Sequence, residues 1–252
     1  MFRLVQLFAK LWRIQWKYLL FGSYVYVEKG SAFACAKGCK IVNSKIHLQN
    51  NSTLIIENGV IIKQTRFLLS KGVVRVGEQS FFSNGVMPTK QEIIVSNGNI
   101  TFGKFNRIRA QKFWVRFGGV IKFGDYINLN EYSEIRCDES IQIGDFVEIS
   151  YHVRIWDTNT HELEPLEKRR NRWIEQYLKR DVSEKPKTKP IIIGSDTWIG
   201  ESVSILKGSI LGTGCVCGYA TCISGKQIPD NMTVINQVEL RVFPNCYNTE
   251  LS

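Results

Sequence analysis

Residues 190–243, PIIIGSDTWIGESVSILKGSILGTGCVCGYATCISGKQIPDNMTVINQVELRVF, decide the fold because they repeat with a period of six. Counted from Ile193, the first positions of the sixes are mostly apolar: Ile193, Ile199, Ile205, Leu211, Cys217, Ile223, Pro229 and Ile235. Glycine often follows these positions, and the fifth positions are mostly small or β-branched. A period of six is neither a helix period nor simple strand alternation. It predicts a short strand and a tight corner, repeated, so that three units make one coil of a triangular solenoid whose first-position side chains point inward.

An imperfect form of the same repeat extends upstream through residues 24–155. An aliphatic or phenylalanine anchor, usually followed by glycine, recurs about once per coil: Ile56, Val76, Phe102, Phe123 and Ile143. The intervals exceed three perfect sixes, which predicts short insertions at the corners. All the anchors together predict about eight or nine coils, a stack on the order of 40 Å tall at about 4.8 Å per strand layer.

The anchor spacing jumps after Ile143, because the next anchor is Ile193. One coil accounts for part of this interval, and the remainder predicts an inserted loop over residues 157–190. Within the loop, RRNRWIEQYLKR at 169–180 indicates a short helix, and KPKTKP at 185–190 indicates an extended return to the coil. A long loop in a compact repeat protein is usually either functional or disordered.

The composition is that of a folded, basic protein of 252 residues, with 44% hydrophobic residues and a formal net charge of +10. This charge favours an acidic partner such as a phosphate group, an anionic membrane surface or an acidic glycan. We expect no nucleic-acid partner, because the sequence contains no motif of a nucleic-acid-binding module.

The seven cysteines are an odd number, and they are not grouped at the spacing of zinc ligands. We therefore expect no metal site. Cysteines inside the repeats serve as small apolar residues of the core. Free thiols, together with the absence of a signal-peptide pattern, predict a reducing and cytoplasmic location.

The segment MFRLVQLFAKLWRIQWKYLLF at the start of the chain predicts a basic amphipathic helix, to which we assign residues 1–23. Its polar residues form one narrow helical stripe: Arg3, Gln6, Lys10, Arg13 and Lys17. These charges interrupt the segment too often for a transmembrane span or a signal peptide. Two interpretations stay open: peripheral binding at the inner face of a membrane, or packing on the solenoid or another subunit as a cap. Residues 24–243 then form the solenoid domain, and 244–252 a C-terminal tail.

The sequence contains three histidines, and only one stands at a place that suggests chemistry. His47 lies in an irregular early coil and is expected at the surface, whereas His152 is expected to be structural. His161 lies in Trp156-Asp-Thr-Asn-Thr-His161, where the inserted loop leaves the coil. One coil later the sequence reads Trp198-Ile199-Gly200.

These motifs resemble those of the hexapeptide-repeat acyltransferases, over residues 30–243 and most strongly over 141–235. The chain is most similar to members that O-acetylate sugars of bacterial capsule, lipopolysaccharide or sialic-acid pathways. The resemblance implies an all-β, left-handed parallel β-helix, a homotrimer, and acetyl-CoA as co-substrate. It also implies that His161 is the general base, accompanied by Trp198. Asp157 or Glu162 could orient its imidazole, a role suggested only by proximity in sequence.

Alignment of the regular coils with the family assigns acetyl-CoA binding to these residues: Gly200, Glu201, Gly218, Tyr219, Ser224, Lys226 and Arg241. The basic members of this set suit the phosphates of CoA. The chain departs from the family at Asn236–Glu239, where members usually carry Gly-Asn-Pro-Ala, and at Ser224–Lys226, where they usually carry Thr-Lys-Asp.

The sequence thus predicts an O-acetyltransferase that moves an acetyl group from acetyl-CoA to a sugar hydroxyl of a cell-surface polysaccharide or its precursor, including a lipid-linked one. Two alternatives stay open. One is N-acylation of an amino nucleotide sugar with the same base and co-substrate. The other is a non-catalytic scaffold in glycan assembly, in which His161 would be replaceable. A carbonic anhydrase of the same fold is disfavoured, because it needs three histidine ligands around a metal.

Overall fold

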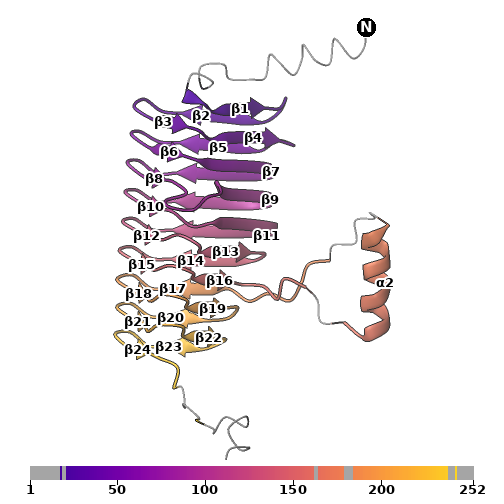
Figure 1. Ribbon diagram of the computed structural model, residues 1–252, viewed down its shortest axis with the longest axis vertical. Coiled ribbons are helices and arrows are strands. Elements are labelled where there is room, and N and C mark those ends of the chain that lie inside the picture. The colour runs from indigo at the N-terminus through magenta and orange to yellow at the C-terminus, as the bar shows by residue number, and fades with distance from the viewer. Residues whose placement is uncertain (1–17, 19–20, 162–163, 179–183, 238–241, 243–252) are drawn as a thin grey trace, which may run out of the picture.

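The computed structural model describes residues 18, 21–161, 164–178, 184–237 and 242 of the chain. The coils stack along the long axis of the molecule, from the N-terminal coils at one end to the C-terminal coils at the other (Figure 1). Strands of successive coils pair in parallel throughout the stack. The predicted fold, a left-handed parallel β-helix, is confirmed.

Each coil has three sides, so the solenoid has three faces. The first face consists of β1 (Tyr24–Val27), β4 (Lys45–Gln49), β7 (Thr65–Val76), β9 (Gln91–Phe102), β11 (Lys112–Phe123), β13 (Glu134–Cys137), β16 (Arg154–Trp156), β19 (Ser204–Leu206) and β22 (Cys222–Ser224). The second face consists of β2 (Ala32–Cys35), β5 (Thr53–Ile56), the later halves of β7, β9 and β11, and then β14 (Ser140–Ile143), β17 (Ile191–Ile193), β20 (Ile210–Leu211) and β23 (Gln227–Ile228).

The third face is a separate nine-stranded sheet. It consists of β3 (Lys40–Val42), β6 (Ile61–Lys63), β8 (Phe81–Phe82), β10 (Arg107–Ile108), β12 (Asn128–Leu129), β15 (Glu148–Ile149), β18 (Trp198–Ile199), β21 (Val216–Cys217) and β24 (Thr233–Val234). Nine layers agree with the eight or nine coils that the anchor spacing predicts.

The core is a column of apolar side chains that alternate inward along every strand. On the second face, Ile121 pairs with Ile141 and Ile141 pairs with Ile191, and all three are completely buried. The coils from β7 to β11 fill the same space with phenylalanine, and the Phe102 ring contacts the Phe82 ring at a centroid distance of 4.9 Å. Register between coils therefore follows from stacking like positions, because a one-residue slip would expose the apolar set.

The predicted inward direction of the first positions is confirmed for the six from Ile193 to Ile223, which are all buried. It is wrong for the last two, since Pro229 is exposed and Ile235 is 70% exposed. Both residues follow the last strands of their faces, β23 and β24, and among the described residues no further coil covers them.

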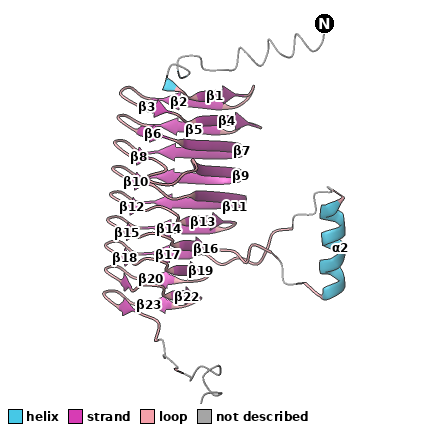
Figure 2. Ribbon diagram, in the orientation of Figure 1, coloured by secondary structure: helices cyan, strands magenta, loops and turns pink. Residues whose placement is uncertain are grey.

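The inserted loop carries α2 (Leu166–Tyr177), which stands apart from the coils (Figures 1 and 2). None of the α2 residues is buried. Glu164, just before the helix, pairs with Lys168 and Arg172 at 3.1 Å each, and so neutralises charge at the first turns. The short helix predicted at 169–180 is confirmed, although it begins a few residues earlier.

The two ends of the chain are described only in part. The predicted amphipathic helix at 1–23 falls mostly on residues outside the described ranges, as does the tail at 244–252. Tyr18 is described, and its ring packs against Phe33 of the first coil at a centroid distance of 5.8 Å. Within the described ranges, no helix has the length and apolar character needed to cross a membrane.

Candidate active site

The inserted loop leaves the solenoid where β16 ends, at the edge between the first and second faces, and its two ends are bonded together. Asn159 donates its backbone N–H to the carbonyl of Lys187 at 3.1 Å, and Lys189 donates to the carbonyl of Asp157 at 3.0 Å. Thr158 forms an antiparallel bridge with Thr188 between these bonds. The base of the loop is therefore a short two-stranded stem.

Asp157 stands at the foot of this stem and is completely buried. Its carboxylate accepts hydrogen bonds from the backbone N–H groups of Asp138 at 2.8 Å, Glu139 at 2.9 Å and Ser140 at 2.8 Å. Burial raises the pKa of the Asp157 carboxyl, and the N–H donors oppose that shift. Among the described residues, His161 is not a hydrogen-bond partner of Asp157. The observed contacts join the loop base to the corner between β13 and β14, which is a structural role.

Thr160 is the last residue of the stem, and its backbone is held in an unusual conformation. Its φ is 68°, in the left-handed region that β-branched residues rarely adopt. Its N–H donates to Thr158 Oγ1 at 3.1 Å, and Arg136 Nη1 donates to its Oγ1 at 3.4 Å. The Arg136 guanidinium lies 4.3 Å from the ring centroid of Trp156 and 5.4 Å from that of Trp114. Strained backbone that neighbours hold in place is frequent at functional sites.

His161 follows directly, with an exposed side chain at the edge between the first and second faces. A surface substrate can therefore reach its imidazole. The other two histidines make ring contacts away from this stem. His152 is exposed at the corner between the third and first faces, where its ring stacks on Tyr132 at a centroid distance of 4.9 Å. His47, expected at the surface, is half-buried beside Tyr26.

A pocket of about 340 Å³ lies at the other edge of the first face, where it meets the third face. Four residues predicted to bind acetyl-CoA line it together with Trp198, which was predicted to accompany His161: Gly200, Glu201, Gly218 and Tyr219. Three more contribute that the sequence did not indicate: Ser150, Val216 and Cys217. Trp198 and Tyr219 are 57% and 73% exposed, so the pocket has large apolar surfaces open to a ligand.

The two glycines of the pocket are required by close contacts between coils. A Cβ added to Gly200 would lie 2.6 Å from the carbonyl oxygen of Cys217 in the next coil. A Cβ added to Gly218 would lie 2.7 Å from Cγ2 of Ile235. The glycines therefore let successive corners approach, and they leave backbone uncovered beside the pocket.

The remaining predicted residues lie elsewhere. Ser224, at the end of β22, and Lys226 are exposed on the edge from which the inserted loop leaves, two coils further on. Within one copy of the chain they are separated from the pocket by the first face. Arg241 and Glu162 lie outside the described residues.

The predicted site is thus divided between two edges of the first face. His161, Ser224 and Lys226 lie on the edge with the second face, whereas the pocket beside Trp198 and Tyr219 lies on the edge with the third face. A reaction that uses both groups requires the two edges to come from different copies of the chain.

Arg136 and its two tryptophans are absent from the sequence-based assignment. Their spacing held a signal, because Trp114, Arg136 and Trp156 occupy the same register position in successive coils. An alignment of the irregular coils by strand register would have brought them together. In the described part of the chain, no group of three His, Cys, Asp or Glu residues could hold a metal ion.

Comparison with known proteins gives two relatives by sequence. WbbJ of Escherichia coli K12, assigned as an O-acetyl transferase of lipopolysaccharide biosynthesis, is 32% identical over 158 residues. These residues are 62% of this chain and 76% of WbbJ. Rv3034c of Mycobacterium tuberculosis H37Rv, assigned as an acetyltransferase, is 30% identical over 131 residues, which are 52% of this chain and 37% of that protein.

A comparison of folds agrees with the sequence relatives, although no family model matches the sequence. The crystal structure of the polySia-specific acetyltransferase NeuO superposes with a TM-score of 0.50 and 19% identity, covering 88% of each chain. At this identity the likeness concerns the fold alone. The repeat, the β-helix and the extent of the match to WbbJ together place the chain in the hexapeptide-repeat acyltransferases, and it is an acetyltransferase.

Proposed function

We propose that this protein transfers an acetyl group from acetyl-CoA to a sugar hydroxyl of a cell-surface polysaccharide or its precursor. The assigned reaction of WbbJ, O-acetyl transfer in lipopolysaccharide biosynthesis, supports this acceptor class. The observation that carries the proposal is the convergence of Trp198, Gly200, Gly218 and Tyr219 in one pocket, with His161 exposed at the end of a held stem.

The pocket is the proposed acetyl-CoA site. Its open aromatic surfaces, formed by Trp198 and Tyr219, suit the apolar pantetheine arm. The exposed cation Lys226 on the opposite edge suits the phosphates of CoA once a second copy brings that edge close.

His161 is the proposed general base. Its imidazole takes the proton of the acceptor hydroxyl while the oxygen attacks the thioester carbon. The carbon–sulfur bond then breaks, and the imidazolium returns the proton to the thiolate of CoA. Holding the two substrates together supplies much of the rate, so no protein nucleophile is needed.

Because the two edges face apart in one copy, we propose that copies assemble as a homotrimer with one shared site at each contact. A closed ring of heterologous contacts places the His161 edge of one copy against the Trp198 pocket of the next. Light scattering should give about three times the chain mass of 28.9 kDa.

The chemistry is tested with a transfer assay on the full chain. His161→Ala should lower acetyl transfer at least about 10²-fold, the usual contribution of a general base, and should keep acetyl-CoA binding. His47→Ala is the matched control, because it removes an imidazole from β4, several coils before the site. Acetyl-CoA should raise the melting temperature of the wild type and of both variants. Unchanged transfer in His161→Ala would refute the assignment of the base.

The shared site is tested by mixing two inactive chains. His161→Ala removes the base, and Val216→Trp fills the pocket of the other edge, because the half-buried Val216 side chain lines that pocket without the close coil contact of Gly218. Coexpressed chains should regain part of the activity, because some contacts then join an intact edge from each variant. If the mixture stays inactive although mixed oligomers form, each copy holds a complete site and the trimer model is wrong.

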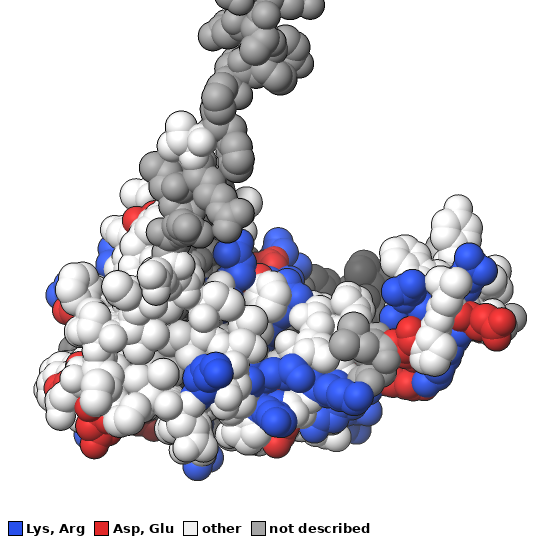
Figure 3. Space-filling view, turned by 90° about the horizontal axis from the view of Figure 1, so that it is seen from below, with Lys and Arg blue, Asp and Glu red and all other residues white. Residues whose placement is uncertain are grey.

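We also propose a cytoplasmic enzyme that contacts a membrane surface through the basic segment at 1–23. The support is its sequence, with an apolar face and a narrow cationic stripe, and the net charge of +10. Figure 3 shows Lys and Arg side chains gathered along one side of the solenoid seen from its C-terminal end. Deletion of residues 1–21 should abolish binding to anionic liposomes at low salt and keep transfer to a soluble acceptor. Loss of the trimer in the deleted protein would favour a cap instead.

A further inference from the structure

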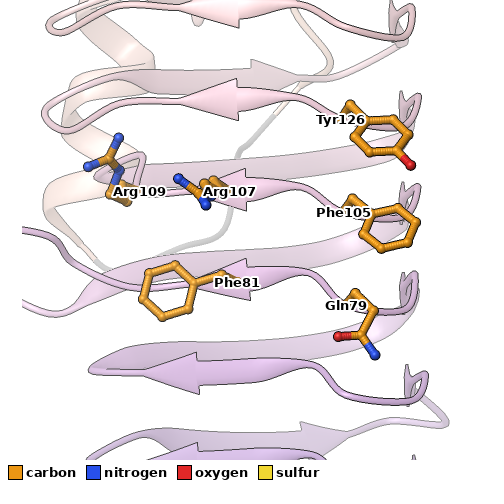
Figure 4. A pocket seen from close by; sticks show the side chains of 6 residues that line it. All are labelled: Gln79, Phe81, Phe105, Arg107, Arg109 and Tyr126. Atoms are coloured by element: carbon orange, nitrogen blue, oxygen red, sulfur yellow. The ribbon is translucent and has the colours of Figure 1, made fainter.

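A second pocket lies on the third face, several coils before the proposed acetyl-CoA site. It encloses about 660 Å³ and is lined by six residues: Gln79, Phe81, Phe105, Arg107, Arg109 and Tyr126. Figure 4 shows Gln79, Phe105 and Tyr126 along one side, Arg109 on the other, and Phe81 and Arg107 between them. We call this surface the arginine groove. Neither the assigned activity nor the proposed acetyl-transfer site uses it.

The aromatic wall of the groove is rigid before any ligand binds. The rings of Phe105 and Tyr126 stack at 4.9 Å with an interplanar angle of 10°, and Tyr126 stacks on Phe146 at 4.9 Å and 4°. These rings are 42%, 49% and 55% exposed. A preformed wall lowers the conformational entropy that a ligand must overcome on binding.

This wall is not a general property of the corner. The same corner position carries Asp196, Gly214 and Asn231 in the last three coils, and all of these tolerate positive φ. Phe105 and Tyr126 adopt φ of 57° and 58°, where a bulky side chain is disfavoured. The chain therefore accepts strain to place exposed aromatic rings beside the groove, and such strain is frequent at binding sites.

The floor supplies a positive charge that no described carboxylate neutralises. Arg107 is exposed and lies between Phe81 and Asn128 in the strand register. Among the described residues, no carboxylate forms a salt bridge with its guanidinium. Its partner in the groove, Arg109, is already engaged, because Glu131 lies 3.6 Å from its Nη1.

The residues around Arg109 bind its guanidinium, so it is not available to bind an anionic ligand. Its Nη2 donates to Asn130 Oδ1 and to Asn128 Oδ1, the latter at 3.3 Å, while its Nε is buried without a hydrogen-bond partner in the described part of the chain. Lys63 adds a second cation near the floor, with Nζ 5.9 Å from the centroid of the Phe81 ring. The groove thus combines the available guanidinium of Arg107, a nearby ammonium and apolar rings.

This combination selects a ligand that carries both a carboxylate and an apolar ring face. A guanidinium pairs with a carboxylate through two parallel hydrogen bonds. The ring face of a sugar can pack on Phe81 while its hydroxyls reach Gln79. A flat aromatic base is less well matched, because Phe105 and Tyr126 cover each other's faces.

The position of the groove connects it to acetyl transfer. Arg107 is on β10 and Trp198 is on β18 of the same sheet, in the order β10-β12-β15-β18. Three strand spacings of about 4.8 Å separate them by about 14 Å, a distance that a short oligosaccharide can span.

From these contacts we infer that the arginine groove is a subsite for an acidic sugar residue of the polysaccharide acceptor. It holds one residue of the polymer while another residue of the same polymer reaches the acetyl-transfer site. The identity of the ligand as the acceptor rests on the proposed function, whereas the binding of acidic sugars does not.

Binding is tested directly on the full chain without acetyl-CoA. The probe is an oligomer of galacturonic acid, and its carboxyl-reduced form is the neutral control. Calorimetry should show that the acidic oligomer binds at least about tenfold more tightly than the neutral one, and that Arg107→Gln removes this difference. Arg75→Gln is the matched variant, because Arg75 is exposed on the second face and its loss changes the net charge equally.

If Arg107→Gln and Arg75→Gln lose affinity for the acidic oligomer equally, the effect comes from net charge and the subsite is overturned. The subsite is also overturned if neither variant loses affinity. A change of oligomeric mass in Arg107→Gln by light scattering would also overturn it, because the groove would then be a subunit contact. Phe81→Ala provides a second variant and should weaken the binding of both the acidic and the neutral oligomer.

A transfer assay separates this inference from the proposed function. Arg107→Gln should raise KM for a long acidic acceptor about tenfold and leave KM for a monosaccharide acceptor and for acetyl-CoA unchanged. If His161→Ala abolishes transfer but Arg107→Gln leaves every KM unchanged, the enzyme assignment stands and the subsite fails. If acidic oligomers require Arg107 but no acetyl transfer occurs, the subsite stands and the acceptor role fails.

Discussion

The early and late coils of this solenoid share one backbone plan but use different side chains. In the early half, the coils from β7 to β11 place phenylalanine in the core, and the corner of the third face carries Phe105 and Tyr126. In the late coils, isoleucine and cysteine fill the core, and the same corner carries Gly214 and Asn231. The backbone plan therefore does not determine surface chemistry, and each half can carry a different site: the arginine groove early, the proposed acetyl-CoA pocket late.

The contribution of an apolar side chain to the free energy of unfolding should differ most between the middle and the end of the stack. Phe102→Ala removes a fully buried ring that touches Phe82, Phe113 and Phe123, and should lower the free energy of unfolding by about 3–5 kcal/mol. Ile235→Ala, at a residue that is 70% exposed, should lower it by less than about 0.5 kcal/mol. Urea denaturation followed by circular dichroism measures both. Similar losses would mean that residues outside the described ranges cover the last coil.

The junction of the two halves depends on Asp157. The two carboxylate oxygens of Asp157 now accept three backbone N–H hydrogen bonds. In Asp157→Asn only one oxygen remains to accept them, and the side-chain NH₂ group would face a backbone N–H donor. The free energy of unfolding should fall by about 1–3 kcal/mol. The rate of acetyl transfer should fall only because the inserted loop is displaced, so KM for acetyl-CoA should stay unchanged. A direct partnership with His161 would instead alter the pH profile of kcat without loss of stability.

The same carboxyl gives a pH dependence of defined sign. Burial raises its pKa in the folded protein above the ordinary value of an unfolded chain. Between those two values the folded state binds more protons than the unfolded state, so this group's contribution to stability falls as pH rises. The wild type should show this decrease across the acidic range, and Asp157→Asn should lack it. Denaturant melts at successive pH values measure the difference.

Two exposed corner tyrosines distinguish the early half from the late half. Tyr219→Ala removes a wall of the late pocket and should raise KM for acetyl-CoA about tenfold, with little change in stability because Tyr219 is 73% exposed. Tyr126→Ala removes part of the arginine groove. It should leave KM for acetyl-CoA unchanged and weaken the binding of acidic oligomers. If both variants change the same constant, the two pockets are not independent.

The smallest effect is expected at the stem that holds His161. Arg136→Lys keeps a cation between Trp114 and Trp156 but loses the planar guanidinium and its bond to Thr160. It should lower kcat up to about tenfold and leave KM for acetyl-CoA unchanged, because a displaced base affects only the reacting geometry. Thr160→Ser, which keeps the hydroxyl, should retain most of the activity. A change in acetyl-CoA binding would contradict a positioning role.

The period of six residues predicted a triangular solenoid, and the spacing of the anchors predicted the number of coils and the place of the inserted loop. Equivalent positions of successive coils stack on one another in the core, so a short repeated pattern is enough to indicate the overall fold. The same regularity predicts that Gly200, Gly218 and Tyr219 lie close together, because residues of regular coils align at a constant interval along the chain.

The contacts between irregular coils and the separation of edges required the tertiary structure. Arg136 stacks between Trp114 and Trp156 because corner insertions keep strand register while changing sequence spacing. Asp157, placed beside His161 by sequence proximity, turns inward to three backbone N–H groups one coil away. The sequence by itself determined which residues repeat and hence the fold and family. Only the structure decided which edge each residue occupies, because edges depend on every insertion that precedes them.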